Sequence, residues 1–267
     1  MLVSIVTPSF NQAKFLEATI LSVLEQDYPN IEYFIVDGGS TDGSLEIIKK
    51  YEQRLTGWVS EKDRGQTDAI NKGFGQAKGD ILAWINSDDT YEAGAVREAV
   101  EILSSDPSLG MVYGDTNFID ETGAVRGKFP AHQTDYARLQ RGYVHIPQQA
   151  AFFRGDLWRK VGPLDPDFYF AMDYDLWVRL AREAPLLYVP RVWANFRLHG
   201  EAKTITADAR CWPEMLRVHR RDGGSWFSII YAKYLIRKLA APVINRRRRK
   251  LLKPEQASKN GGGKRGF

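Results

Sequence analysis

The sequence contains very little cysteine and histidine. Its 267 residues include one cysteine, Cys211, and four histidines. A single cysteine forms no disulfide within the chain, and no Cys/His cluster has the spacing of a zinc site. The sequence therefore predicts neither a disulfide-stabilised module nor a structural zinc protein, and a chain of this length buries a sizeable core without such cross-links.

Long apolar runs are also missing. No stretch approaches the roughly 18 uncharged apolar residues that span a bilayer. The N-terminus, MLVSIVTPSF, has no charged segment, extended apolar run or small-residue cleavage site, so no secretory signal is expected. Hydrophobic residues make up 43% of the chain and charged residues 26%, which are ordinary globular values. These features predict a globular, cytoplasmic protein.

Charge is divided unevenly along the chain. The formal net charge is +4, but residues 217–267 contain 15 Lys/Arg and 2 Asp/Glu, so they carry +13 and leave −9 on the first 216 residues. An acidic body with a basic extension favours an anionic partner for the extension.

Strand and helix patterns alternate over the first 105 residues. Strand-like runs end near Pro8, Val36, Ser60 and Ile85, and helical apolar spacing follows each of them. This order predicts an α/β fold with a mostly parallel sheet, covered on both faces, whose strand carboxyl ends share the ligand-binding edge. Four polar turns should meet there: Thr7-Pro-Ser9, Asp37-Gly-Gly-Ser40, Glu61-Lys-Asp-Arg64 and Asn86-Ser-Asp-Asp89.

Two adjacent carboxylates, Asp88 and Asp89, end the fourth predicted strand. Neighbouring carboxylates repel each other unless a cation lies between them. Mg²⁺ and Mn²⁺ prefer oxygen ligands and commonly bridge substrate phosphates. The pair therefore predicts a divalent-metal site, and capping of the helix that begins near Ala93 is the alternative role.

Four motifs resemble those of family 2 glycosyltransferases: Ser4-Ile-Val-Thr-Pro-Ser-Phe-Asn11, Val36-Asp-Gly-Gly-Ser-Thr-Asp-Gly43, Asp68-Ala-Ile-Asn-Lys-Gly73 and Asp88-Asp89. The resemblance extends from about Val3 to Thr204 and implies a single Rossmann-like domain of the glycosyltransferase A type. The expected catalytic domain covers 1–216, with a nucleotide-binding half (1–105) and an acceptor-binding half (106–216). A basic amphipathic helical extension (217–253) and a disordered tail (254–267) are expected to follow it.

The resemblance implies nucleotide contacts at the first three turns. Thr7 and Pro8 would line the base and ribose of a nucleoside diphosphate. Asp37 would hydrogen-bond the base, commonly uracil, and Asp63 would contact the nucleotide from the third strand.

It also implies the metal site. Asp88 would contact the ribose or the metal, and Asp89 would bind a metal that bridges the diphosphate. Asn86 lies where relatives often carry Asp, so the carboxylate that dominates metal binding stays open. His199, in Phe-Arg-Leu-His-Gly, would complete the metal sphere or touch the diphosphate, with a structural role as the alternative.

The second half resembles the family's acceptor-side signature in Gly162-Pro-Leu-Asp165 and Met172-Asp-Tyr-Asp-Leu-Trp-Val-Arg179. Many relatives carry Glu-Asp where this chain has Met172 and Asp173, and the Asp acts as the catalytic base. Asp173 would lie in the first turn of a helix, where a capping role is the alternative. Asp175 is the other candidate base. Contacts to the donor or acceptor sugar are expected from Gln148, Gln149 and Arg197.

The resemblance thus implies an inverting, metal-dependent glycosyltransferase. Asp173 would deprotonate a hydroxyl of a glycan or lipid-linked glycan, which attacks the anomeric carbon of a nucleotide sugar, most often a UDP-sugar. Cell-surface polysaccharide synthesis would be the setting. The alternatives are a nucleotidyltransferase, whose phosphate-cradling loop is missing after the first strand, and a non-catalytic sugar-nucleotide-binding scaffold, which Met172 in place of Glu would suit.

Residues 225–244 predict an amphipathic helix. Tyr231, Leu235 and Leu239 fall on one side, Lys233 and Arg237 fall on the opposite side, and a basic run follows at 246–250. Such a helix predicts peripheral attachment to an anionic membrane surface at its inner face. A helix packed on the body with a solvated basic end is the alternative, and no nucleic-acid partner is expected.

Overall fold

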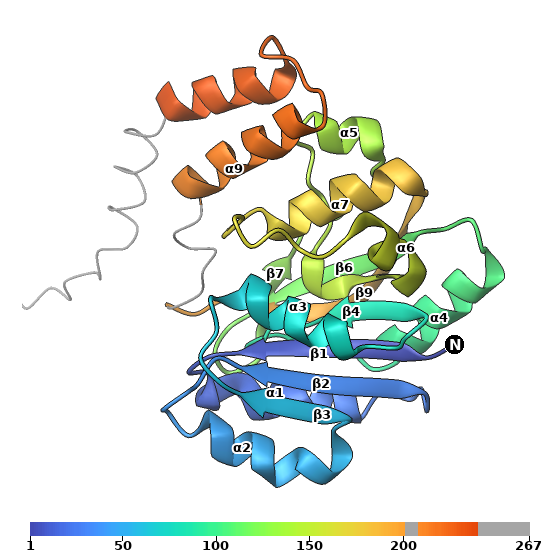
Figure 1. Ribbon diagram of the computed structural model, residues 1–267, viewed down its shortest axis with the longest axis vertical. Helices are drawn as coiled ribbons and strands as arrows, with labels where there is room; N and C mark the ends of the chain where they lie inside the picture. Colours follow the sequence, from blue (N-terminus) through green and yellow to red (C-terminus); the bar gives the residue numbers. More distant parts are fainter. Residues whose placement is uncertain (201–207, 240–267) are drawn as a thin grey trace, which may run out of the picture.

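A nine-stranded mixed sheet forms the centre of the computed structural model, which describes residues 1–200 and 208–239 (Figure 1). Its first half is parallel, in the strand order β3-β2-β1-β4. The strands are β1 (Val3–Ser9), β2 (Ile31–Asp37), β3 (Gly57–Ser60) and β4 (Ile81–Trp84). The connecting helices are α1 (Ala13–Leu24), α2 (Ser44–Tyr51) with the 3₁₀ turn η1 (Glu52–Arg54), and α3 (Gln66–Gln76). The predicted α/β fold is confirmed.

The second half of the sheet mixes both strand directions. Its elements are β5 (Thr90–Tyr91), β6 (Met111–Ile119), β7 (Val125–Lys128), the 3₁₀ turn η2 (Gln148–Ala150), β8 (Ala151–Arg154) and β9 (Leu186–Arg197). Strand β8 runs antiparallel to both β4 and β6, while β6 runs parallel to β9. Strand β6 is continuous from Met111 to Ile119, and its register against β9 shifts on either side of Asp115.

Helices cover both faces of the sheet. Since successive side chains of a strand point in opposite directions, each central strand contributes to both packed layers. On β4, Leu82 and Trp84 pack on one face, and Ile81 and Ala83 pack on the other. The first face contacts α3, α5 (Tyr136–Gln140), α6 (Gly155–Val161), α7 (Met172–Glu183) and α9 (Asp208–Arg221). The second face contacts α1, α2 and α4 (Ala95–Ser105).

Strand register brings the predicted polar turns to one edge. Ser9 lies opposite Asp37, and Asp37 lies opposite Ser60. Val6 lies opposite Trp84, so the turn after β4 leaves the sheet on the same side. Parallel strands share this end of the sheet, as the alternating pattern predicts.

The C-terminal region of the described chain belongs to the main core. Helix α9 runs through residue 216, where the sequence predicts a boundary, and Val218 and Ile230 are fully buried with the residues of α7. Within the described part of the chain, no helix is long and apolar enough to cross a membrane. Residues 240–253 of the expected extension and the expected tail, 254–267, lie outside the described residues.

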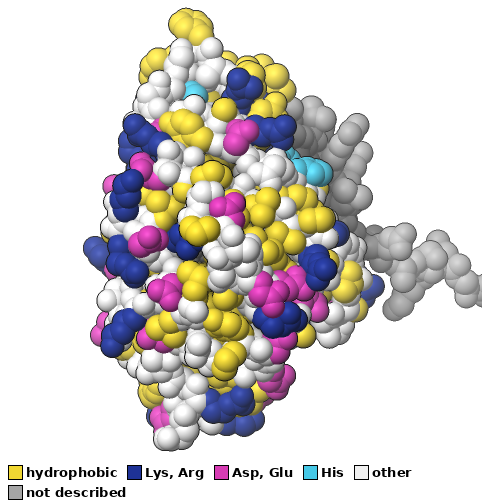
Figure 2. Space-filling model, turned by 90° about the vertical axis from the view of Figure 1, so that its right-hand side faces the viewer, with side chains coloured by type: hydrophobic (Ala, Val, Ile, Leu, Met, Phe, Trp, Pro, Cys, Tyr) yellow, Lys and Arg dark blue, Asp and Glu magenta, His cyan; other side chains and the backbone are white. Residues whose placement is uncertain are grey.

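Residues 229–239 form a helix that turns an apolar face outward. We call this surface the outer apolar face; its members are Trp226, Phe227, Ile229, Leu235, Ile236 and Leu239, which are 49–101% exposed. The Lys233 ammonium lies 3.3 Å from the ring centre of Tyr143, and the Arg237 guanidinium lies 5.5 Å from that of Trp212. Tyr231 and Tyr234 pack against the body, so Tyr231 does not share the exposed side of Leu235 and Leu239 as expected, and Arg237 is itself exposed. Figure 2 shows hydrophobic side chains at the end of the molecule where Figure 1 draws this helix.

Candidate active site

The first turn does not present the side chains of Thr7 and Pro8. Both are buried within β1, and the Thr7 hydroxyl lies 2.9 Å from the Tyr33 hydroxyl. Strand β1 is central and covered on both faces, so its side chains face the core. Contacts of Thr7 and Pro8 with a nucleotide, as expected from the sequence, would therefore come from their backbone atoms. Phe10, the first residue beyond the strand, is 59% exposed, and the buried Ser9 hydroxyl has no hydrogen-bond partner among the described residues.

The first three turns touch one another at Gly38. A Cβ atom at this position would lie 2.9 Å from Asp63 Oδ2 and 3.2 Å from a ring carbon of Phe10. Glycine is therefore required for the three turns to meet. Asp63 Oδ1 accepts a 2.8 Å hydrogen bond from the Gly65 N–H, which orients the carboxylate. Phe10 was missed by the sequence reasoning, although an aromatic residue directly after a central strand was the available signal.

Asp37 lies beneath this contact and is fully buried. Its carboxylate accepts hydrogen bonds from the backbone N–H groups of Gly39 and Ser40 and from the hydroxyls of Ser40 and Ser60. These four donors hold the turn after β2 closed and tie it to β3. A nucleotide base would share this carboxylate or displace one of the two hydroxyls.

The side chains of Asp88 and His199 meet at the same edge of the sheet, although the two residues are 111 positions apart in the sequence. Asp88 Oδ2 lies 2.9 Å from His199 Nε2, and the two side chains are 21% and 4% exposed. Arg197 is buried; its guanidinium donates to the carbonyls of Asp88, Asp120 and Glu121. The guanidinium of Arg197 therefore binds the turns around Asp88. This differs from the prediction that Arg197 contacts the donor or acceptor sugar.

Asp89 has quite different surroundings from its neighbour. It is fully buried, and its carboxylate accepts from the Arg197 N–H at 3.0 Å and from the Asn86 amide at 3.3 Å. Burial raises the pKa of Asp89 well above its usual range, and the nearby Asp88 charge raises it further. Only Asp88 of the pair reaches the accessible edge.

The donor set fits a hard divalent ion held by few protein ligands. The described residues hold no group of three or more His, Cys, Asp or Glu arranged for a metal. Mg²⁺ commonly takes one or two carboxylates and completes its shell with water and substrate phosphates. Asp88 and His199 are hydrogen-bonded to each other at 2.9 Å, so a metal held by both would replace this hydrogen bond.

A chain of three amides lies beside the carboxylates. Gln66 Nε2 donates to Asn86 Oδ1 at 2.6 Å, Asn86 Nδ2 donates to Gln148 Oε1 at 3.3 Å, and Gln148 Nε2 donates to the Trp84 carbonyl at 2.7 Å. Gln149 follows in η2 and is 5% exposed. Gln148 therefore lies beside Asn86, whereas Gln66, from the start of α3, was not among the predicted residues.

The same end of α3 reaches the acceptor-side helix. The Thr67 hydroxyl lies 2.9 Å from the sulfur of Met172 and 3.3 Å from the Phe168 carbonyl. Met172 is buried, and its sulfur accepts the hydrogen bond from the Thr67 hydroxyl. Asp173 follows in the first turn of α7 and is partly exposed. Helix α3 therefore links the carboxylate turn to the segment that carries Asp173.

Asp175, the other candidate base, is fully buried. Its carboxylate pairs with Arg179 at 3.0 Å and with Arg221. Both oxygens are therefore engaged by guanidinium groups inside the protein, and an acceptor hydroxyl has no access to them.

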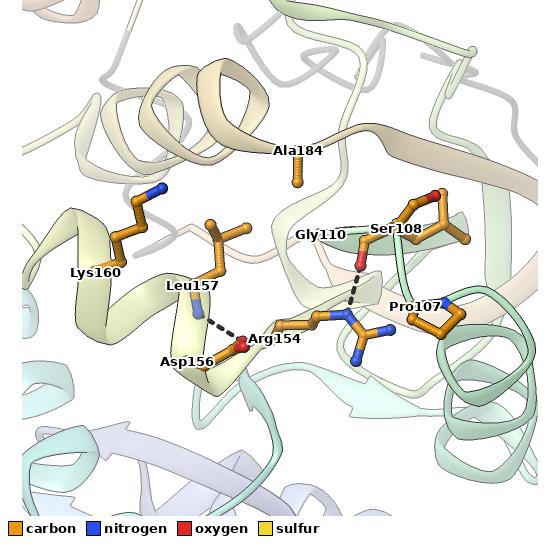
Figure 3. A pocket seen from close by; sticks show the side chains of 9 residues that line it. Pro107, Ser108, Gly110, Arg154, Asp156, Leu157, Lys160 and Ala184 are labelled. Atoms are coloured by element: carbon orange, nitrogen blue, oxygen red, sulfur yellow. Dashed lines mark hydrogen bonds between the residues drawn. The ribbon is translucent and has the colours of Figure 1, made fainter.

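A cavity of about 260 Å³ lies at the opposite edge of the sheet, near the end of β8 and the start of β6 (Figure 3). The Arg154 guanidinium there donates to the carbonyls of Leu103, Asp106 and Leu109. Lys160 pairs with Glu183 at 2.6 Å. Both cations that line the cavity are engaged in structural contacts, so this cavity is not the candidate site.

Known proteins share both the sequence pattern and the fold. The model of "Glycosyl transferase family 2" matches residues 4–162. An uncharacterized glycosyltransferase of Mycobacterium tuberculosis is 32% identical over 241 residues, which cover 86% of this chain and 90% of that protein. Chondroitin synthase of Escherichia coli is 27% identical over 206 residues, which cover 76% of this chain but 30% of the synthase.

Two solved structures have a similar fold. S. aureus TarS in complex with UDP-GlcNAc has a TM-score of 0.67 at 17% identity, over 88% of this chain and 72% of that chain. The Pyrobaculum calidifontis mannosyltransferase PcManGT, in complex with GDP-Man and Mn²⁺, has a TM-score of 0.64 at 21% identity, over 87% of this chain and 68% of that one. The architecture is thus that of glycosyltransferases of the A type. Together with the matched motifs of the first 162 residues, it shows that the chain belongs to glycosyl transferase family 2.

Proposed function

We propose that this chain is an inverting, metal-dependent glycosyltransferase that uses a nucleoside-diphosphate sugar, with a UDP-sugar as the expected donor. The acceptor is a hydroxyl of a glycan or lipid-linked glycan in cell-surface polysaccharide synthesis. The observation that supports the proposal is that the first turn of α3 contacts both the turn that carries Asp88, through Gln66 and Asn86, and the start of α7, through Thr67 and Met172. Chemistry at a phosphate and at an acceptor hydroxyl requires this proximity.

The contact of Phe10, Gly38 and Asp63 supports donor binding. An exposed aromatic ring offers a face on which a nucleotide base stacks, and carboxylates accept hydrogen bonds from base or ribose. In this proposal the Asp37 carboxylate accepts a hydrogen bond from the base, and the Ser9 hydroxyl and the backbone of Thr7 and Pro8 form the remaining contacts with the nucleotide. UDP-GlcNAc and GDP-Man each occupy a solved glycosyltransferase of similar fold, so the nucleotide is decided by experiment.

Asp88 and His199 are the proposed ligands of Mn²⁺ or Mg²⁺, and buried Asp89 supports the turn that holds Asp88. Such an ion supplies positive charge that stabilises the departing diphosphate. Gln148, which is partly exposed beside Asn86, faces the sugar in this proposal, whereas the buried Gln149 supports the turn from within.

Asp173 is the proposed general base. It takes the proton of the acceptor hydroxyl as that oxygen forms a bond to the anomeric carbon and the bond to the nucleoside diphosphate breaks. Attack from the opposite face inverts the configuration. Membership of family 2 gives no support to nucleotidyl transfer, whereas a non-catalytic scaffold remains a possible outcome of the test.

The outer apolar face supports peripheral binding to an anionic membrane. A helix that only packed on its own body would bury its apolar side. Here Leu235, Ile236 and Leu239 are exposed, the neighbouring Arg237 and Lys238 are exposed as well, and a basic run follows in the sequence at 246–250. Exposed apolar residues near basic residues are typical of helices that lie in the membrane interface.

The test is release of nucleoside diphosphate from a panel of UDP-, GDP- and dTDP-sugars, with Mn²⁺ and with EDTA. We expect metal-dependent release from one donor. Asp173→Asn should lower that rate by roughly 10²–10⁴-fold, the usual contribution of a general base, with nucleotide affinity nearly unchanged. A rate near wild type in this variant would exclude Asp173. No release from any donor, together with no thermal stabilisation by any nucleotide, would contradict the enzyme and favour the scaffold.

A further inference from the structure

Glu214 of α9 binds the backbone immediately before α7. Its Oε1 accepts from the Tyr169 N–H at 3.1 Å, and its Oε2 accepts from the N–H groups of Phe170 and Ala171, both at 2.8 Å. Successive N–H groups that converge on one carboxylate form an anion-binding nest. The carboxylate comes from more than 40 residues further along the chain, so it fixes tertiary structure rather than a local turn.

Within helix α7, Asp173 Oδ1 accepts from the Tyr174 N–H at 2.7 Å, but no side chain of the helix itself caps its entry. Its N-cap residue is Ala171, and no side-chain capping hydrogen bond is present there. An N-cap without an acceptor leaves the entry to a helix poorly fixed. Glu214 therefore supplies acceptors for the backbone N–H groups of residues 169–171, which end two residues before Asp173.

Two further residues of α9 bind the same segment. Arg217 donates to the Asp167 carbonyl at 2.7 Å, and its guanidinium lies 3.9 Å from the ring centre of Phe168. Arg221 pairs with the buried carboxylate of Asp175 in the first turn of α7. Helix α9 thus contacts the chain on both sides of Asp173.

We propose that Glu214 is a positioning residue that sets the place of Asp173 by fixing residues 169–171. This inference rests on the proposed role of Asp173 as the base. A displacement of a catalytic group by about 1 Å costs up to roughly 10²-fold in rate. The glycosyltransferase site therefore extends to α9, which lies beyond the 4–162 region that defines the family match.

The first test compares Glu214→Gln with Glu183→Gln by hydrogen exchange in the full chain. Glutamine keeps the shape of Glu214 but replaces one acceptor oxygen with an amide that donates. The amides of residues 169–171 should exchange faster in Glu214→Gln. They should be unchanged in the control, whose carboxylate pairs with Lys160 at the other end of α7. Unchanged exchange in both variants would overturn the proposal without any assay of turnover.

The second test is a double-mutant cycle with Asp173→Asn, measured on the donor that the sugar-nucleotide panel selects. Glu214→Gln alone should lower kcat roughly 10–100-fold with the donor KM unchanged. Added to Asp173→Asn, it should cause no further loss, because it acts through that carboxylate. Additive losses would overturn the positioning role alone. A normal rate for Asp173→Asn would instead contradict the proposed base.

Discussion

Asp88 and Asp89 are adjacent in the chain but have opposite surroundings. The Asp88 side chain is 21% exposed and lies against His199, whereas Asp89 is fully buried and accepts hydrogen bonds from Arg197 and Asn86. Both residues lie in the turn between β4, which ends at Trp84, and β5, which begins at Thr90, and the contacts of this turn place the two side chains in different surroundings. One residue is thus available for a ligand while the next holds the turn.

Alanine at the two positions should therefore have separable effects. Asp89→Ala leaves the buried Arg197 N–H without an acceptor and should lower the free energy of unfolding by about 1–3 kcal/mol. Asp88→Ala should change it by less than about 1 kcal/mol and abolish the Mn²⁺ dependence of donor cleavage. Urea unfolding and a metal titration of the rate measure the two effects. Equal destabilisation by both changes would contradict the different roles.

Gly38 is a second single residue with a specific role, because its lack of a side chain permits the contact of the first three turns. Gly38→Ala places a Cβ 2.9 Å from Asp63 Oδ2, so the carboxylate must move. We expect UDP affinity to fall about tenfold, which corresponds to about 1.4 kcal/mol. Calorimetric titration measures it, with Gly57→Ala as the control, because that Cβ meets Phe34 only at 3.4 Å. Unchanged affinity would remove this contact from the nucleotide site.

At the scale of elements, α3 joins the two halves of the domain. Its first turn binds Asn86 through Gln66 and Met172 through Thr67. One turn later, Asn71 donates to the Leu164 carbonyl at 2.8 Å and accepts from the Leu164 N–H at 3.0 Å. A single rigid helix thus sets the distance between the carboxylate turn and the acceptor-side segment.

Asn71→Ala should loosen this connection. It leaves the N–H and carbonyl of the fully buried Leu164 unpaired, which costs about 2 kcal/mol of unfolding free energy. Lys72→Ala on the same helix, which removes the ion pair with Glu61 at 2.8 Å, should cost less than about 1 kcal/mol. Urea denaturation compares the two variants. A larger loss in Lys72→Ala would show that the surface ion pairs, not Asn71, hold α3.

At the scale of the whole molecule, the outer apolar face and the active-site edge belong to one rigid core. Ile230 anchors the terminal helix beneath this face, and α9 connects it to α7. A membrane bound at the outer apolar face would therefore have a fixed orientation to the edge of the sheet that carries Asp88 and His199.

Replacement of Ile236 and Leu239 by Glu in the full chain tests whether the outer apolar face binds the membrane. Both side chains are exposed, by 66% and 81%, so the fold should persist. Sedimentation with phosphatidylserine-containing vesicles should fall at least about tenfold, because two buried side chains each contribute about 1.5 kcal/mol or more. Val125→Glu, at a side chain 60% exposed on β7, should leave sedimentation unchanged. Undiminished binding of the double variant would show that this face is not the contact.

The sequence by itself determined the features that depend on local pattern. Alternating strand and helix periodicities predicted the parallel half of the sheet, and the turn residues after each strand predicted which edge carries the polar groups. The motifs near Asp37, Asp63 and Asp88 indicated the family, because their residue types and spacing are read along the chain without knowledge of contacts.

Only the tertiary structure decided which of these side chains face outward and which partners they meet. Burial of Thr7 and Asp89 depends on helices that cover the sheet, and the Asp88–His199 pair joins positions 111 residues apart. Glu214 reaches the entry of α7 from a helix that no motif marks, and the outer apolar face depends on how residues 229–239 pack. Periodicity reports local geometry, whereas exposure and pairing follow from contacts between distant segments.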